Sequence, residues 1–374
     1  MTHYERMHAA MALKKPDRVP VMCQLSFGHM ERNSGVPLIE LHYSSEGLAR
    51  VFLIMREMYN FDGILLNTWK PRDWKKRFDS IKIRDTVNGR EYEMPDGRVL
   101  MEIDKSLQVV NSNVKHKAWD AGEHPSIEDI NPKDVAYHLD YSGEMSLQET
   151  IVAEGKKNNF SVHGEISSPV DGLCILLGLE NTMMAFLLEP DRCKPLLEGY
   201  VTQNVEFAKA QIDVGVDTMK ISSPFVGGSF ISRACYEEFV VPYEGELVRQ
   251  IKQYCPTMPI YTHTCGFIGD RLELMQSTGI DGIECMDPPP LGDTELADAK
   301  RRVGKSMFLK GNMDSVNVLL NATPEILDEY IKQMIADGGA DGGYILSSAC
   351  SVAPEVDPEI MKLLVPLAVK YGTY

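Results

Sequence analysis

The sequence predicts an α/β protein folded as a (β/α)8 TIM barrel, and three observations lead to this fold class. About eight short apolar, β-branched runs are each followed by a stretch with helical periodicity. The length of 374 residues suits such a barrel. No linker, repeat or low-complexity tract divides the chain. We therefore expect residues 1–374 to form a single domain.

The predicted strands share an apolar composition that is typical of a buried parallel sheet. They cover residues 19–24, 62–67, 160–164, 217–222, 259–264, 281–285, 307–310 and 343–347. Helices are expected over 45–59, 179–188, 190–213, 268–277, 294–303 and from 357 to 372, and another begins at Pro324 with Thr323 as its N-cap. Strands and helices alternate regularly from residue 149 onwards, and less cleanly before it.

Two segments in the first half of the chain do not follow the barrel pattern. Between residues 81 and 103, Asn88-Gly89 and Asp96-Gly97 are hairpin turn signals, so we expect an inserted β-meander there. Residues 114–143 are polar and contain proline, which favours an irregular lid or surface excursion.

The net charge, the first residues and the cysteine content bear on which partners and which cellular compartment we expect. A net charge of −16 disfavours binding to nucleic acid or to an anionic membrane surface. The first twenty residues lack the apolar run of a signal peptide, so we expect a cytoplasmic protein. In that setting the eight cysteines do not indicate a disulfide framework. A few of them are candidate metal ligands.

The strand predicted over 259–264 ends in a pair of potential metal ligands. His263 and Cys265 are separated by one residue, so strand alternation places both side chains on one face. An imidazole and a thiolate side by side form half of a zinc site. On its own such a pair is also compatible with ordinary packing of a buried cysteine and histidine.

Other strand ends can complete this site, because barrel chemistry lies at the carboxyl ends of the strands. Cys350 follows the eighth predicted strand, and Glu284 ends the sixth. His263, Cys265 and Cys350 would supply an N, S, S set with one open position, which Glu284 could fill at rest. Cys285 competes with Glu284, but alternation directs it toward the helix layer, so we favour Glu284.

A sulfur-rich zinc site favours one kind of chemistry over another. Two thiolates and an imidazole leave the complex with zinc roughly neutral, which makes a mild Lewis acid. Coordination still removes the proton of a thiol, whose free pKa is about 8.5. Such a site therefore suits the alkylation of a thiol better than the splitting of water.

Further polar residues at strand ends are candidates for binding substrate. A single histidine at such a position is as often structural, and an amide or carboxylate there can equally brace a loop. The candidates are His163, Glu165, Ser222, Asn312 and Asp314.

The chain resembles the uroporphyrinogen decarboxylase superfamily, and within it the branch of corrinoid-dependent methyltransferases. The residues that carry the resemblance extend over nearly the whole chain. They are Asp17-Arg-Val-Pro-Val21, Pro169, Ser222-Ser-Pro224, Ile231-Ser232, Phe239–Tyr243, His263-Thr-Cys-Gly266, Lys310-Gly-Asn-Met-Asp314, Ser348-Ala-Cys350 and Pro354. The resemblance implies zinc held by His263, Cys265 and Cys350, with Glu284 as an exchangeable ligand.

The chain departs from the family pattern in places that bear on function. The decarboxylases have an Arg-rich segment after the first strand and an Asp near the end of the second, whereas this chain has Leu25-Ser-Phe-Gly-His29 and Asn67-Thr-Trp69. Tetrapyrrole decarboxylation is therefore not expected. The residues before Cys350 are Ser347-Ser-Ala, whereas the family usually has a glycine-rich segment at this place. The identity of the methyl acceptor is therefore left open. No D-x-H-x-x-G motif occurs, so a corrinoid would arrive on a partner protein.

We therefore expect a zinc-dependent methyltransferase that moves a methyl group between a corrinoid, methylcobalamin on a partner protein, and a zinc-activated thiol. One alternative is a demethylating methyltransferase that acts on a methoxylated or methylated small molecule, with cobalt as the methyl acceptor. Another alternative is a barrel in which zinc is purely structural.

Overall fold

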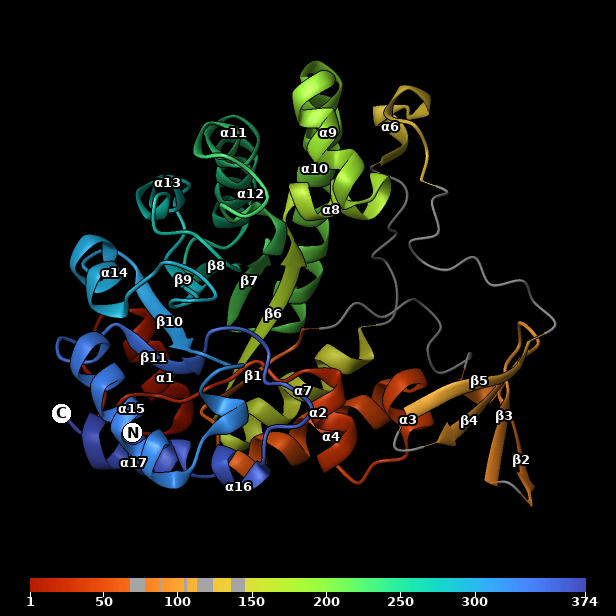
Figure 1. Cartoon of the computed structure of the whole chain (residues 1–374), viewed down its shortest axis with the longest axis horizontal. Coiled ribbons are helices and arrows are strands. Elements are labelled where there is room, and N and C mark those ends of the chain that lie inside the picture. The colour runs from red at the N-terminus through yellow and green to blue at the C-terminus, as the bar shows by residue number, and fades with distance from the viewer. Residues whose placement is uncertain (68–77, 88, 104–105, 113–123, 136–144) are drawn as a thin grey trace.

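The structure, a computed structural model, describes residues 1–67, 78–87, 89–103, 106–112, 124–135 and 145–374. Among these residues, seven parallel strands form one curled sheet in the order β1-β6-β7-β8-β9-β10-β11 (Figure 1). The strands are β1 (Gly63–Leu65), β6 (Ser161–Ser167), β7 (Thr218–Ser222), β8 (Ile260–Thr264), β9 (Gly282–Cys285), β10 (Phe308–Met313) and β11 (Tyr344–Ser348). The predicted α/β class with a parallel sheet is confirmed.

The first predicted strand, over residues 19–24, is not a strand of this sheet. It makes isolated parallel bridges from Val21 to Leu346 and from Leu25 to Val352, and Val21 O accepts a hydrogen bond of 2.9 Å from the backbone N–H of residue 62. The segment thus lies between β11 and β1, where an eighth strand would lie. Pro20 cannot donate to a ladder, which limits regular pairing here. Closure into a full barrel stays a prediction.

Helices follow each of the strands from β6 onwards, as the alternating pattern predicted, and Thr323 caps α15 through a hydrogen bond to Ile326 N. The helices are α1 (His3–Met11), α2 (Phe27–Asn33), α3 (Leu38–Tyr43), α4 (Ser45–Tyr59), α6 (Pro132–Val135), α7 (Ser146–Asn158), α8 (Pro169–Leu177), α9 (Leu179–Leu188), α10 (Pro190–Val214), α11 (Arg233–Phe239), α12 (Val241–Tyr254), α13 (Leu272–Ser277), α14 (Leu296–Val303), α15 (Pro324–Gly338), α16 (Pro358–Met361) and α17 (Leu364–Gly372), with short 3₁₀ turns at Ile127–Asp129, Pro224–Val226 and Leu319–Asn321.

A second, antiparallel sheet occupies the stretch where a β-meander was predicted, and it stands to one side of the parallel sheet (Figure 1). Its strands are β2 (Lys82–Thr86), β3 (Gly89–Glu93), β4 (Arg98–Ile103) and β5 (Ser106–Ser112); the sequence did not predict β5. Tyr92 and Leu100 pack with Ile39 of α3 in a small separate core. Most of the expected excursion at 114–143 lies outside the described residues, as do residues 68 and 69.

The main core lies between the parallel sheet and its helices, and it is formed mostly by aliphatic side chains with almost no exposure. No single helix of the described chain is long and apolar enough to cross a membrane. Helices α8 and α9 would meet that test only as a pair, by length and composition, and they are bent by 108°.

Candidate metal centre

The register of the parallel sheet brings the ends of β8 and β9 side by side. His263 pairs with Glu284, and Thr264 pairs with Cys285. Cys265 follows β8 directly, and Cys350 lies two residues beyond the end of β11. Four side chains from three separate parts of the chain therefore meet at one edge of the sheet, together with Cys285.

The nitrogen and sulfur atoms of the three residues predicted as metal ligands lie close together. His263 Nε2 is 3.2 Å from Cys265 Sγ, and Cys265 Sγ is 3.7 Å from Cys350 Sγ. Bond lengths of about 2.0–2.3 Å to a tetrahedral zinc ion imply ligand–ligand separations of about 3.5–3.8 Å. The donor types suit zinc, and the separation of the two sulfurs matches that of two ligands of one tetrahedral ion, whereas the His263–Cys265 separation is shorter than such an ion requires. Among the described residues, the group of potential ligand atoms that all lie within 4.8 Å of one another comprises His263, Cys265 and Cys285, and does not include Cys350.

Glu284 lies on the other side of the His263 ring. Its Oε2 atom is 3.0 Å from His263 Nδ1, and its carboxylate also contacts Lys310 Nζ and, at 3.4 Å, Lys220 Nζ. Burial alone would raise the pKa of Glu284, but Lys310, Lys220 and His263 together hold it well below its usual range. Glu284 is thus an ionised, fully partnered carboxylate behind the imidazole.

Cys285 also belongs to this cluster, although strand alternation had placed it in the helix layer. Its backbone has φ of +82°, followed by +56° at Met286, so the pleat ends there and the side chain turns toward the site. One ligand atom each from His263, Cys265 and Cys285 lie within 4.8 Å of one another. Hydrogen bonds from the thiols of Cys285 and then Cys350 lower the pKa of Cys265.

The residues proposed to bind substrate fall into two groups. The first group lies on the strands. His163 is wholly buried, and its Nδ1 atom is 3.0 Å from the Tyr261 hydroxyl. Ser222 is half-buried and pairs in register with His263. Asn312 Nδ2 donates to the carbonyls of residues 286 and 294 at 3.0 Å, while Asp314 accepts from the N–H groups of residues 316 and 317. Their described contacts are those of loop-bracing groups.

Sequence reasoning missed two lysines in the interior of the sheet. Lys220 and Lys310 have at most 1% of their side chains exposed. Lys220 Nζ is 2.9 Å from Glu165 and 2.6 Å from Gln24 Oε1, so it links β6, β7 and the segment after Pro20. A lysine in the middle of an otherwise apolar strand is the signal that could have revealed both, because buried lysines require a partner.

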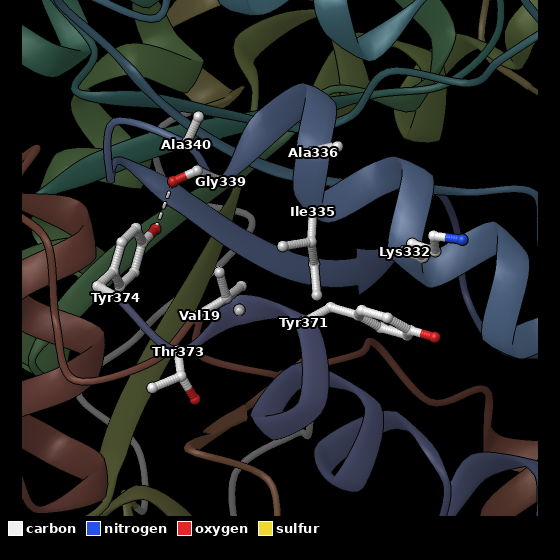
Figure 2. Close-up of a pocket in the computed structure, with 10 residues that line it drawn as sticks. Val19, Lys332, Ile335, Ala336, Gly339, Ala340, Tyr371, Thr373 and Tyr374 are labelled. Carbon is white, nitrogen blue, oxygen red and sulfur yellow. Dashed lines mark hydrogen bonds between the residues drawn. The ribbon is translucent and has the colours of Figure 1, made fainter.

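A separate cavity of about 390 Å³ lies away from this cluster. Figure 2 shows it between the end of α15 and the C-terminal segment, where the Tyr374 hydroxyl donates to Gly339 O at 2.6 Å. Most of its lining is apolar, and it lies at the end of the sheet where β11 begins. Its lining includes no histidine, cysteine or carboxylate side chain, so we do not assign chemistry to it.

Comparison with known proteins gives a family and a fold. The model of the uroporphyrinogen decarboxylase (URO-D) family matches residues 115–371. Uroporphyrinogen decarboxylase of Ruthia magnifica is 31% identical over 170 residues, which are 45% of this chain and 46% of that protein. The match therefore spans about half the length of this curated decarboxylase. Methylcobamide:CoM methyltransferase MtbA of Methanosarcina mazei is 23% identical, and the alignment covers 99% of both chains.

Solved structures show that the fold is shared with known proteins. A methyltransferase from Methanosarcina mazei superposes with a TM-score of 0.72 at 18% identity, and the match covers 99% of both chains. A B12-independent methionine synthase from Shewanella sp. gives a TM-score of 0.52 at 13% identity, over 95% of this chain and 97% of that one. These likenesses concern the fold alone. The family match covers well over half of the residues, and the chain therefore belongs to the uroporphyrinogen decarboxylase (URO-D) family.

Proposed function

We propose that this protein is a zinc-dependent methyltransferase that moves a methyl group between a corrinoid carried by a partner protein and a small-molecule thiol. The observation that carries the proposal is the set of N, S and S donors of His263, Cys265 and Cys350, in which Cys265 Sγ lies 3.2 Å from His263 Nε2 and 3.7 Å from Cys350 Sγ. The full-length similarity to an MtbA methyltransferase supports the same activity. We also propose that residues 19–25 act as the eighth strand and close the barrel around this rim.

Each residue of the cluster has a separate task in this proposal. His263 Nε2 and the sulfurs of Cys265 and Cys350 hold the ion, and Glu284 is the predicted occupant of the remaining position. A bound zinc ion lowers the pKa of a thiol that binds beside it, so that a thiolate is available at neutral pH. In the position that the structure shows, Lys310 and Lys220 hold the pKa of Glu284 well below its usual value in spite of its burial.

The surroundings of the cluster favour a nucleophilic sulfur over hydrolysis. All residues of β8 and β9 are buried, and Cys265 and Cys350 are the more exposed members of the site. A thiol would thus approach from the side of the two cysteines, while the strands exclude water from the side of His263. A poorly hydrated thiolate is the more reactive nucleophile toward a methyl group.

The test uses purified protein with methylcobalamin and a panel of small thiols. Loss of the methylcobalamin spectrum should require both zinc and a thiol, and it should be abolished in Cys265→Ser and Cys350→Ser. Cys193→Ala, which alters a buried cysteine in α10 away from the cluster, serves as the control and should keep the activity. Retention of full activity by both serine variants would contradict the proposal.

A structural zinc site is the second candidate function, because Cys285 adds another protein donor to the cluster. Structural zinc is enclosed by four protein ligands and does not exchange them. Titration of the zinc protein with 2-mercaptoethanol separates the two functions. Spectroscopic binding of the added sulfur favours the methyltransferase, whereas an unchanged metal environment favours the structural site.

A further inference from the structure

We infer that Gln24 is a positioning residue for Cys350, because its side chain ties the loop that carries this cysteine to the buried Lys220. The inference rests on the proposed function, since it concerns how a predicted metal ligand is held. The link runs from Ser351 through Gln24 and Lys220 to Glu284. It therefore joins the loop after β11 to β9 through side chains in the interior of the sheet.

The segment over residues 19–24 directs Gln24 into the interior of the curled sheet. Met22 packs in an interior cluster that includes Tyr261, Phe308 and Ile345. Side chains two residues apart on an extended segment share a face, so Gln24 faces the same interior as Met22. Its side chain is half-buried and reaches the strand ends at which the candidate ligands lie.

Each end of the Gln24 amide has its own partner. Lys220 Nζ donates to Gln24 Oε1 at 2.6 Å, and Gln24 Nε2 donates to Ser351 Oγ at 2.8 Å. An ammonium group can only donate, so the amide oxygen must face Lys220 and the amide nitrogen must face Ser351. Lys220 thus fixes the orientation in which Gln24 reaches the residue next to Cys350.

Lys220 is a firm anchor for this link. Its side chain is 1% exposed, and its ammonium group lies 2.9 Å from Glu165 and 3.4 Å from Glu284. A lysine has three N–H donors, and Glu165, Glu284 and Gln24 offer three acceptors. The ammonium group is therefore held from three sides, and it holds Gln24 in turn.

The backbone around Gln24 attaches the same loop one residue further on. Gln24 O accepts from Val352 N at 2.8 Å, and Ser26 N donates to Val352 O at 3.3 Å. These bonds hold Val352, whereas the Gln24 side chain holds Ser351, which is closer to the sulfur. Loss of the side chain should therefore loosen Cys350 while the loop stays attached at Val352.

The other end of the loop is held in a similar way. Lys310 Nζ donates to Ser347 Oγ at 3.2 Å and also contacts Glu284. Cys350 thus lies between two serines, Ser347 and Ser351, whose hydroxyls accept from groups linked to the same carboxylate. A glycine at position 347 would have no hydroxyl, so this second attachment depends on a residue at which the chain departs from its family.

The first test measures zinc affinity by competition with a chromogenic chelator. Gln24→Met keeps the length of the side chain and removes both hydrogen bonds. We expect it to weaken zinc binding by about 10-fold, the lower end of the range for residues that orient metal ligands, because the bonds to Val352 remain. Ser351→Ala should also weaken binding. The double variant should match Gln24→Met, because both changes remove one shared bond.

Two control variants accompany this measurement. Ser351→Thr keeps the hydroxyl that accepts from Gln24, and it should bind zinc as the wild type does. Gln250→Met changes another half-buried glutamine, on α12, whose Nε2 donates to Glu246 at 2.7 Å. This matched control removes a side-chain hydrogen bond on an outer helix and should leave zinc affinity unchanged.

The second test uses the metal-free protein and does not depend on the proposed function. Iodoacetamide alkylates accessible thiols, and peptide mapping gives separate rates for Cys350 and Cys265. A looser loop exposes Cys350, so the ratio of its rate to that of Cys265 should rise in Gln24→Met and in Ser351→Ala. The ratio should stay at the wild-type value in Gln250→Met. A role of Gln24 in overall stability alone would lower Tm and leave the ratio unchanged.

The outcomes separate this inference from the proposed function. An unchanged zinc affinity or an unchanged alkylation ratio in Gln24→Met would overturn the inference and leave the methyltransferase proposal intact. Losses of affinity that add in the double variant would also overturn it. A wild-type protein that binds no zinc would overturn the proposed function, and the alkylation ratio would then decide the inference alone. If Gln24→Met does not fold, Ser351→Ala provides both measurements.

Discussion

Replacement of Lys310 by methionine removes one of the two buried ammonium groups that neutralise Glu284. The two side chains are 0% and 1% exposed and in direct contact, so the carboxylate would lose its nearest partner without gaining water. Removal of one member of a buried ion pair costs about 3–5 kcal/mol, and we expect a value near the lower end because Lys220 remains 3.4 Å away.

The expected change in thermal stability follows from the length of the chain. For 374 residues the entropy of unfolding is about 0.8 kcal/mol/K, so Lys310→Met should lower Tm by about 4–6 °C. Calorimetry of the metal-free protein at pH 7 measures this without interference from metal binding. The double variant Lys310→Met/Glu284→Gln removes both charges and should recover much of the loss.

The dependence on pH gives a second measurement of the same pair. In the wild type the pKa of Glu284 lies well below its usual value, so its stabilising contribution is complete above the unfolded-state pKa and is lost as pH falls through the folded-state pKa. Without Lys310 the pKa of Glu284 rises. The difference in the free energy of unfolding between the wild type and Lys310→Met should therefore become smaller from pH 7 to pH 5. A single variant as stable as the wild type at pH 7, or a deficit that grows toward pH 5, would refute this reasoning.

Three further predictions concern other parts of the molecule. Asp62 is fully buried and pairs with Arg6 and Arg18, so Asp62→Asn should lower the free energy of unfolding by about 3–5 kcal/mol in urea titrations. A loss within about 1 kcal/mol would indicate that the pairs are no stronger than surface ones. Burial raises the pKa of Glu244 to about 7. Wild-type stability should therefore fall by up to about 3 kcal/mol as pH rises from about 4.5 to 7. A pH series of Tm values should show this slope flattened in Glu244→Gln, and equal slopes would contradict it. Chelation of zinc from the loaded protein should lower Tm, because an ion at a thousand times its Kd contributes about 4.1 kcal/mol. A Tm that does not respond to chelator would count against a zinc site.

Much of the parallel sheet could be predicted because its strands are short, apolar and regularly spaced. Local composition is a sufficient signal for strands such as β6 to β11, which are buried on both faces. The segment over residues 19–24 has a similar composition. However, Pro20 has no backbone N–H to donate, and the segment forms only isolated bridges. The number of ladder hydrogen bonds depends on partners that are hundreds of residues away, and local patterns do not encode them.

The candidate centre could be predicted where strand alternation holds and not where it ends. His263 and Cys265 are brought to one site by their own strand end, as their spacing indicated. Cys285 enters the cluster because its backbone is left-handed, and neither Cys285 nor Met286, the two positions with positive φ, is a glycine or an asparagine that would signal this. A lysine within an apolar strand signals a buried charge, but its partners, Glu165 and Glu284, lie on other strands and are identified only in the folded structure.

The bridges from Val21 to Leu346 and from Leu25 to Val352 also affect the order in which the protein can assemble during synthesis. The ribosome releases residues 19–25 more than three hundred residues before their partners exist. Until then the segment has an unpaired edge, which nascent-chain chaperones recognise. Cys350 belongs to the same late portion of the chain as Leu346 and Val352, so a site that includes its sulfur could form only when these bridges can also form.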